Sequence, residues 1–253
     1  MSFRLLKTIA ADLVSIVRYG RNAALKNYVL WIDLSQINMM IDSQSAEFQN
    51  SVICCKPSTT SSSKLSRLAR RELRRKHNVV TGGDFDRYVV PLSHDETFQR
   101  MKNKIQHDLS WEEAGFVDWM MKRIEENGSH DGCHNRDDVL RRYANLDRLI
   151  ALIRSGKTYT VPASHITRYG GADGIFVAVG RNGEVLFCGR GKHRLAIAQY
   201  LGAPLIPVCV CAVHEIAVQT GHWRKLKDRS RVLSQMIGKQ AAISQSFDDQ
   251  LNN

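Results

Sequence analysis

The clearest pattern of apolar and polar positions lies between residues 175 and 187. Two apolar runs, 175–179 and 184–187, are separated by the polar triplet Arg181-Asn182-Gly183. Short apolar runs bounded by turn residues indicate strands, and an Asn-Gly pair supplies the positive φ angles that a two-residue hairpin turn requires. The pattern therefore predicts a β-hairpin with a two-residue turn.

A helix and a further strand are predicted directly after this hairpin. Residues 195–201 have helical propensity, Gly202 can end the helix, and residues 206–213 form another apolar run. Backbone N–H groups at a helix N-terminus attract anions, and glycines allow an anion to approach closely. We therefore predict a phosphate-binding loop made of Gly189, Arg190, Gly191, Lys192, His193 and Arg194.

The tetrapeptide Gly191-Lys192-His193-Arg194, followed by the strand Ile206-Pro207-Val208, resembles the ParB/sulfiredoxin superfamily. The resemblance implies an α/β (α+β) fold, with a small mixed sheet and packed helices. It also implies that Gly191, His193 and Arg194 bind nucleotide phosphates. Sulfiredoxins carry their catalytic cysteine where this chain has Lys192, so sulfinic acid reductase activity is not expected.

The chain is expected to have four parts. Residues 1–55 form a helical N-terminal arm, because apolar residues recur there at helical spacing, and 56–77 form a serine-rich linker and a basic helix. Residues 78–225 form the ParB/sulfiredoxin-like domain, with a helical insertion at 97–135. Residues 226–253 have little periodicity and are expected to be a polar tail.

The first helix has an apolar stripe whose partner the sequence does not identify. Its members recur at helical spacing, and they are Phe3, Leu6, Ile9, Leu13, Ile16 and Val17. Most such stripes bury against their own domain, which is the expected arrangement here. The alternative is a basic amphipathic helix that lies on a membrane surface.

The chain of 253 residues has 36 Lys and Arg against 25 Asp and Glu, a net charge of +11. Such a charge favours anionic partners, including nucleotides, nucleic acids and acidic lipid surfaces, without choosing among them. No apolar run has the length of a transmembrane segment. The six cysteines lack the spacing of a disulfide framework, so we expect reduced thiols and a cytoplasmic location.

Residues 64–77 carry seven Lys or Arg and one Glu. Clustered arginine neutralises nucleic-acid phosphates, so this segment is the candidate for a nucleic-acid contact, with a solvated helix as the alternative. The arginines concerned are Arg67, Arg70, Arg71, Arg74 and Arg75.

Nucleotide chemistry would need Mg²⁺ or cations around a nucleoside triphosphate and a carboxylate to take a proton. Asp84 and Asp86, in a glycine-permitted turn, are the candidate catalytic residues, and capping of that turn is the alternative. The His and Cys residues at 130–134 match no zinc spacing, so no metal site is expected. Three functions stay open: a nucleotide-binding phosphotransferase or hydrolase, a nuclease-type nucleic-acid-binding protein, and a non-catalytic regulatory protein.

Overall fold

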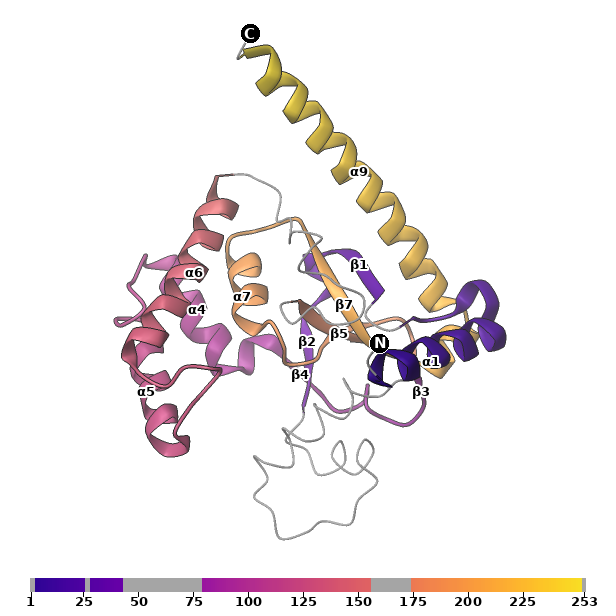
Figure 1. Cartoon of the computed structure of the whole chain (residues 1–253), viewed down its shortest axis with the longest axis horizontal. Coiled ribbons are helices and arrows are strands. Elements are labelled where there is room, and N and C mark those ends of the chain that lie inside the picture. Colours follow the sequence, from indigo (N-terminus) through magenta and orange to yellow (C-terminus); the bar gives the residue numbers. More distant parts are fainter. Residues whose placement is uncertain (1–2, 26–27, 43–78, 156–173, 252–253) are drawn as a thin grey trace. The chain divides into compact units, whose positions relative to one another are not determined.

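The computed structural model of the chain describes residues 3–25, 28–42, 79–155 and 174–251 (Figure 1). These residues form two compact units. Unit 1 takes its residues from Met1–Val90, Thr160–Arg190 and Leu205–Asn253, and unit 2 from Pro91–Tyr159 and Gly191–Pro204.

A seven-stranded mixed sheet forms the centre of unit 1. Its strands are β1 (Tyr28–Asp33), β2 (Met39–Ile41), β3 (Val80–Thr81), β4 (Val89–Pro91), β5 (Ile175–Val179), β6 (Val185–Phe187) and β7 (Leu205–His214). Their order is β1-β7-β5-β6-β2-β4, and β3 also pairs with β7. The β5–β7 and β2–β6 pairs are parallel, whereas β1–β7 and β5–β6 are antiparallel. The expected α/β class with a mixed sheet is therefore confirmed in this general form.

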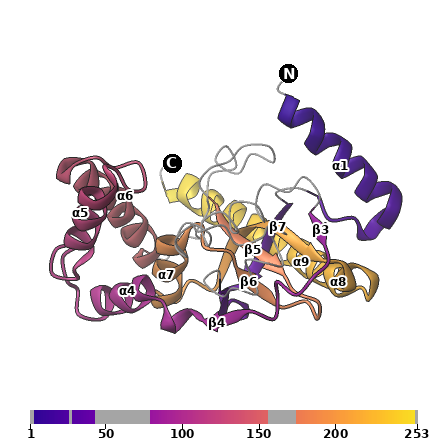
Figure 2. The same cartoon turned by 90° about the horizontal axis from the view of Figure 1, so that it is seen from below.

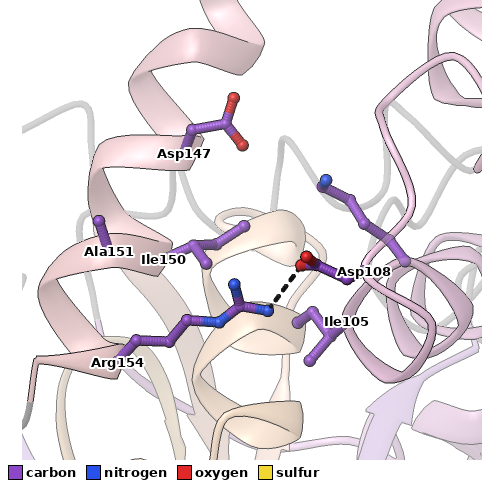
Figure 3. Close-up of a pocket in the computed structure, with 7 residues that line it drawn as sticks. Ile105, Asp108, Asp147, Ile150, Ala151 and Arg154 are labelled. Carbon is purple, nitrogen blue, oxygen red and sulfur yellow. Dashed lines mark hydrogen bonds and ion pairs between the residues drawn. The ribbon is translucent and has the colours of Figure 1, made fainter.

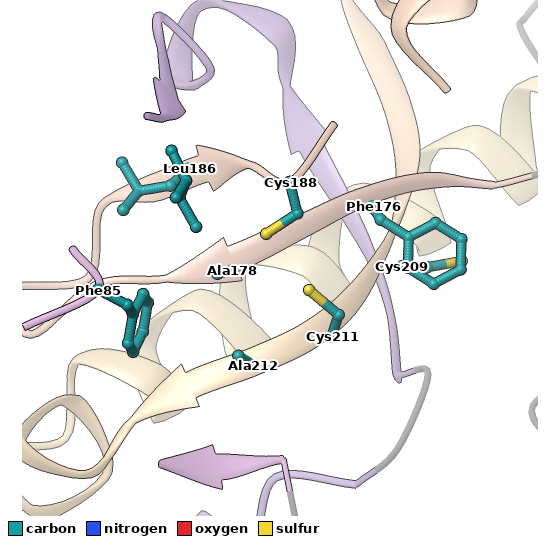
Figure 4. Packing of buried hydrophobic residues seen from close by; sticks show 9 residues of the cluster. Phe85, Phe176, Ala178, Leu186, Cys188, Cys209, Cys211 and Ala212 are labelled. Atoms are coloured by element: carbon teal, nitrogen blue, oxygen red, sulfur yellow. The ribbon is translucent and has the colours of Figure 1, made fainter. Parts of the chain in front are cut away.

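Strand β7, the longest strand of the sheet, is buried along almost its whole length. Every residue of the strand after Leu205 is buried, as expected for a nearly continuous apolar run covered on both faces. One cluster on this sheet, drawn in Figure 4, is made of Ile41, Phe85, Phe176, Ala178, Leu186, Cys188, Cys209, Cys211 and Ala212. The three thiols in it are buried, and that of Cys211 donates to the Val177 carbonyl at 3.2 Å. Buried thiols of this kind pack as small side chains in the core.

The hairpin is present, but its predicted two-residue turn is wrong. The Gly183 N–H donates to the Gly180 carbonyl at 3.0 Å. The Gly180 N–H donates to the Glu184 carbonyl at 2.9 Å and closes the loop. Within the turn only Gly183 has a positive φ, of 89°, and the backbone and side-chain amides of Asn182 both donate to the Glu184 carboxylate. Three residues therefore connect the strands, with the glycine in the left-handed position.

The N-terminal arm is not wholly helical, so this part of the expected organisation is wrong. It begins with helix α1 (Phe3–Tyr19), yet β1 and β2 follow within the first 55 residues. Strand β1 lies beside β7, with Leu30 opposite Val208, and β2 lies beside β6. The arm supplies two strands to the sheet because their partners, far along the chain, satisfy the backbone hydrogen bonds.

The expected C-terminal tail is also wrong, because helix α9 (His222–Leu251) follows the short helix α8 (Glu215–Gln219). Trp223, Ser230 and Ile237 recur every seven residues and are all buried. Because Ser230 is polar, it interrupts the apolar periodicity, and the buried face of α9 is not evident from the sequence. The Ser230 hydroxyl accepts the Trp31 N–H of β1 at 2.7 Å, so a serine is the residue that this buried position needs.

Unit 2 consists of helices α4 (Glu96–Gln106), α5 (Phe116–Asn127), α6 (Arg136–Arg154) and α7 (Lys192–Tyr200), together with a short 3₁₀ turn at Leu92–His94. Asn135 caps α6, since its side chain accepts the Asp138 N–H at 2.9 Å. Phe98, Met101 and Phe116 are fully buried. The expected insertion at 97–135 is therefore part of a helical unit with its own apolar core.

Within the residues that the structure describes, no helix combines the length and the apolar character needed to cross a membrane.

Candidate functional site

The sequence-predicted phosphate loop leads into the first turn of α7. Gly189 and Gly191 have φ angles of 78° and 83°, in the left-handed region that glycine tolerates. Gly191 is the N-cap of α7 and offers no side-chain cap to the N–H groups of the first turn. This turn holds Lys192, His193 and Arg194 and no acidic residue. Its positive helix end therefore lacks an anionic partner from the same turn.

Lys192 forms an ion pair within unit 2. Its Nζ lies 2.6 Å from Asp95 Oδ2, and only 23% and 17% of the two side chains are exposed. The other oxygen of Asp95 accepts the Thr97 N–H and caps α4. Asp95 thus links the start of α4 to the start of α7, and it already balances the charge of Lys192.

His193 does not present a charged imidazole. Its ring packs near Phe116 and Tyr143, with centroids 5.5 Å and 6.1 Å away, and its Nε2 is buried without a hydrogen-bond partner. Burial, and next the nearby Arg142 charge, lower the His193 pKa to about 4. The ring is neutral at pH 7, so a predicted phosphate contact from His193 would carry no positive charge, and the ring packs instead beside Phe116 and Tyr143.

The remaining two basic residues of the loop occupy different settings. The guanidinium of Arg190 lies over the Phe176 ring at 5.3 Å, and the Arg190 carbonyl accepts the Phe176 N–H. Arg194 is half-buried in the first turn of α7. The loop thus offers backbone N–H groups, Lys192 and Arg194 as the groups that suit an anion.

Asp84 and Asp86 converge on a different residue, Arg181 in the hairpin turn of unit 1. Arg181 donates from Nε and Nη2 to the two oxygens of Asp86, at 2.9 and 2.8 Å, and from Nη2 to Asp84 at 2.8 Å. The backbone N–H of Arg181 adds a further bond to Asp86 at 2.7 Å. Two carboxylates on one guanidinium hold the turn against the 83–86 segment.

The electrostatics of this cluster favour ionised carboxylates. Burial raises the pKa of Asp86, but the hydrogen bonds from Arg181 outweigh this effect, and the pKa is lowered overall. The hydrogen bond from Arg181 also lowers the pKa of Asp84. Because both carboxylates already accept hydrogen bonds from Arg181, a structural role fits this geometry better than that of a general base, although the role is to hold the hairpin turn and not to cap their own turn.

Sequence reasoning missed His214 as a member of the same cluster. Its Nδ1 accepts the Ile216 N–H at 3.1 Å and caps α8, while Nε2 lies 2.8 Å from the Gly83 carbonyl. These partners require a neutral ring with its proton on Nε2. A His immediately before a helix start was the only available signal.

The His/Cys-containing loop at 130–134 is a tight turn. His130 and Cys133 exchange two backbone hydrogen bonds, and Asp131 and Gly132 between them have φ angles of 50° and 80°. These are the features of an Asp-Gly hairpin turn. Asp131 pairs with Arg142 at 3.0 Å. Across the described ranges, no three His, Cys, Asp or Glu side chains are grouped so that they could hold a metal ion.

Unit 2 also contains a hollow of about 250 Å³ (Figure 3). Its polar side chains have partners inside the unit: Arg154 pairs with Asp108 at 3.1 Å, Lys104 donates to the Leu109 carbonyl, and Asp147 accepts the Trp111 indole N–H. Since these groups satisfy one another, the hollow presents little unsatisfied polarity to a ligand.

The five arginines proposed for nucleic-acid binding, Arg67, Arg70, Arg71, Arg74 and Arg75, lie outside the described residues. Comparison of the chain with protein-family models, with curated proteins and with solved structures gives no match.

Proposed function

We propose that this chain is a ParB/sulfiredoxin-like protein that binds the phosphates of a nucleotide at residues 189–194. One observation carries the proposal: α7 begins after two left-handed glycines, and its first turn is basic, free of acidic residues and without a side-chain cap. A cation near a helix N-terminus is unfavourable by about 0.3–1 kcal/mol, and an anion there is favourable by a similar amount. A bound phosphate would add a favourable interaction at this helix end, where the basic side chains alone are unfavourable.

The ion pair between Lys192 and Asp95 sets a limit on affinity. Phosphate would share the ammonium with a carboxylate 2.6 Å away. Charge-assisted hydrogen bonds from Lys192 and Arg194 would add to those from the backbone N–H groups. We therefore expect Asp95 to lower the affinity of the proposed site for phosphate.

The proposal concerns binding and assigns no catalytic base. Asp84 and Asp86 hold Arg181 in unit 1, so the two carboxylates considered for phosphotransfer or hydrolysis have another role. No described group of acidic side chains would hold Mg²⁺. Any Mg²⁺ would arrive with the triphosphate. Of the three open functions, nucleotide binding in a regulatory protein therefore agrees best with the geometry.

A thermal-shift series with CTP, ATP, ADP and GTP, each with and without Mg²⁺, tests the proposal. A ligand that binds only the folded state raises the melting temperature. The test variant is Arg194→Glu, which places a negative charge in the first turn of α7. The matched control is Lys225→Glu, with the same change of net charge at an exposed position of α9. We expect a shift in the parent and the control and none in Arg194→Glu.

Two results would overturn the proposal: no shift with any of the four nucleotides, or an unchanged shift in Arg194→Glu. The nucleic-acid alternative now rests on the net charge of +11 and on arginines outside the described residues. A salt titration of DNA binding would test it separately, because phosphate neutralisation gives a steep loss of affinity with salt.

A further inference from the structure

Helix α1 turns its polar face toward its own unit. Asp12 is 6% exposed. Ser15 donates its hydroxyl to the Ala24 carbonyl at 3.0 Å, and the Tyr19 hydroxyl lies 3.2 Å from a Glu215 carboxylate oxygen. These residues are three or four positions apart, so they share one side of the helix. In the part of α1 whose side chains the structure describes, residues 9–19, these contacts to the rest of unit 1 are polar.

The opposite side of α1 is apolar and exposed. Leu13 is 56% exposed, Val14 61%, Ile16 45% and Val17 87%. At 3.6 residues per turn, these four positions span an arc of about 160°. A surface helix ordinarily directs such an arc to the core. The sequence-based expectation that this stripe buries on its own domain is therefore wrong for Leu13, Ile16 and Val17.

We propose that this apolar face of α1, made of Leu13, Val14, Ile16 and Val17, docks on the surface of an anionic lipid bilayer. An exposed, contiguous group of large aliphatic side chains marks an interaction surface. A helix that lies in the bilayer interface buries its apolar face at the boundary between headgroups and acyl chains. The arc on α1 is a broad face of this kind, whereas pairing with one other helix uses a narrower seam.

The charge on α1 suits the same partner. Arg18, 65% exposed, lies at the edge of the apolar face beside Val14, and Arg21 follows it in an exposed position. The acidic Asp12 is turned inward. The ion pair of Arg18 with Glu215 is surface-exposed and therefore weak, so Arg18 can exchange it for a headgroup phosphate. With a chain charge of +11, attraction to an anionic surface accompanies burial of the apolar face.

Flotation of the full chain with vesicles tests the proposal. We expect it to float with vesicles of phosphatidylcholine and phosphatidylserine, and much less with phosphatidylcholine alone. The double variant Val14→Gln/Val17→Gln should lower partitioning by about tenfold or more, because two exposed aliphatic groups lose their burial in lipid. Circular dichroism of the variant establishes that helix content is retained.

The matched control is Val232→Gln/Met236→Gln, which changes two exposed apolar residues, 57% and 59% exposed, on α9. This control should float like the parent. The proposal is overturned if the parent does not float, if both double variants lose flotation equally, or if neither loses it. Light scattering without lipid provides one more test: a parent dimer that Val14→Gln/Val17→Gln converts to monomer would assign the face to a second copy and overturn the lipid assignment.

Discussion

Arg181 donates three hydrogen bonds to the Asp86 carboxylate, one from its backbone N–H and two from its guanidinium, although the two residues are 95 positions apart. Asp86 is almost fully buried, with 3% of its side chain exposed, and Arg181 is 20% exposed. The pair fastens the β5–β6 turn to the segment before β4. It is therefore a structural element of unit 1.

Asp86→Ala should lower the free energy of unfolding by about 3 kcal/mol, because the largely buried guanidinium of Arg181 then loses its main carboxylate partner. Asp84 would keep one hydrogen bond to Arg181, which limits the loss. Urea unfolding measures the effect. The control Asp228→Ala removes an exposed carboxylate whose ion pairs are 3.7 and 3.8 Å long, and should cost about 0.5 kcal/mol or less. Equal losses in the two variants would contradict the role of Asp86.

The same pair predicts a dependence of stability on acid. Since the Asp86 pKa is lowered from 3.8 in the folded state, its contribution is complete above that value and is lost as the pH falls through the folded pKa. Unfolding of Asp86→Asn should lack this part of the acid-induced loss. The measurement is urea unfolding of parent and variant at a series of acidic pH values, and parallel curves would refute the assignment.

Protonation of His193 should make the free energy of unfolding depend on pH in a second, higher range. Its pKa is 6.5 when unperturbed and about 4 in the fold, so protonation favours the unfolded chain as the pH falls from 6.5 toward 4. The associated loss of stability is on the order of 3 kcal/mol. His193→Phe, which also removes the unpartnered Nε2, should flatten this interval, whereas replacing the exposed His107 by Phe should not. A His193→Phe variant as pH-sensitive as the parent would show that the ring is accessible.

Asp95→Asn should strengthen nucleotide binding. Asn caps a helix as well as Asp does, so α4 keeps its cap, while Lys192 loses its carboxylate partner. A released ammonium should raise the affinity by about tenfold in calorimetric titrations. Glu96→Gln, a neutralisation at the neighbouring position, is the control and should change affinity little. If both variants bind alike, Asp95 does not restrain the site.

Ser230→Ala should destabilise unit 1 by about 1 kcal/mol, because the Trp31 N–H then lacks its acceptor in a part-buried position. Ser234→Ala, which removes an exposed bond to the Arg231 carbonyl of the same helix, is the control. Thermal unfolding of both variants measures the difference, and a Ser230→Ala protein as stable as Ser234→Ala would rule out the role of this hydroxyl.

The sequence allowed prediction of those features whose causes are local. The strands of the hairpin, the start of α7 and the Asn135 cap follow from apolar runs, glycines and a capping side chain within a few residues. The Lys192–Asp95 pair spans 97 positions, and nothing local in the sequence reveals it. For the same reason the buried face of α9, made of Trp223, Ser230 and Ile237, could not be predicted, because a buried serine is recognisable only once its partner on β1 is known.

Strand β7, which lies between β1 and β5 in the sheet, also sets the order in which the chain can assemble. Its neighbours β1 and β5 precede it, and β1 lies near the beginning of the chain. During synthesis on the ribosome, the edge of β1 must therefore wait, unpaired, until β7 has emerged. Pairings of such large sequence separation form slowly, and an unpaired strand edge is prone to aggregation. Newly made chains should for this reason depend on chaperones until residue 214 is free of the ribosome.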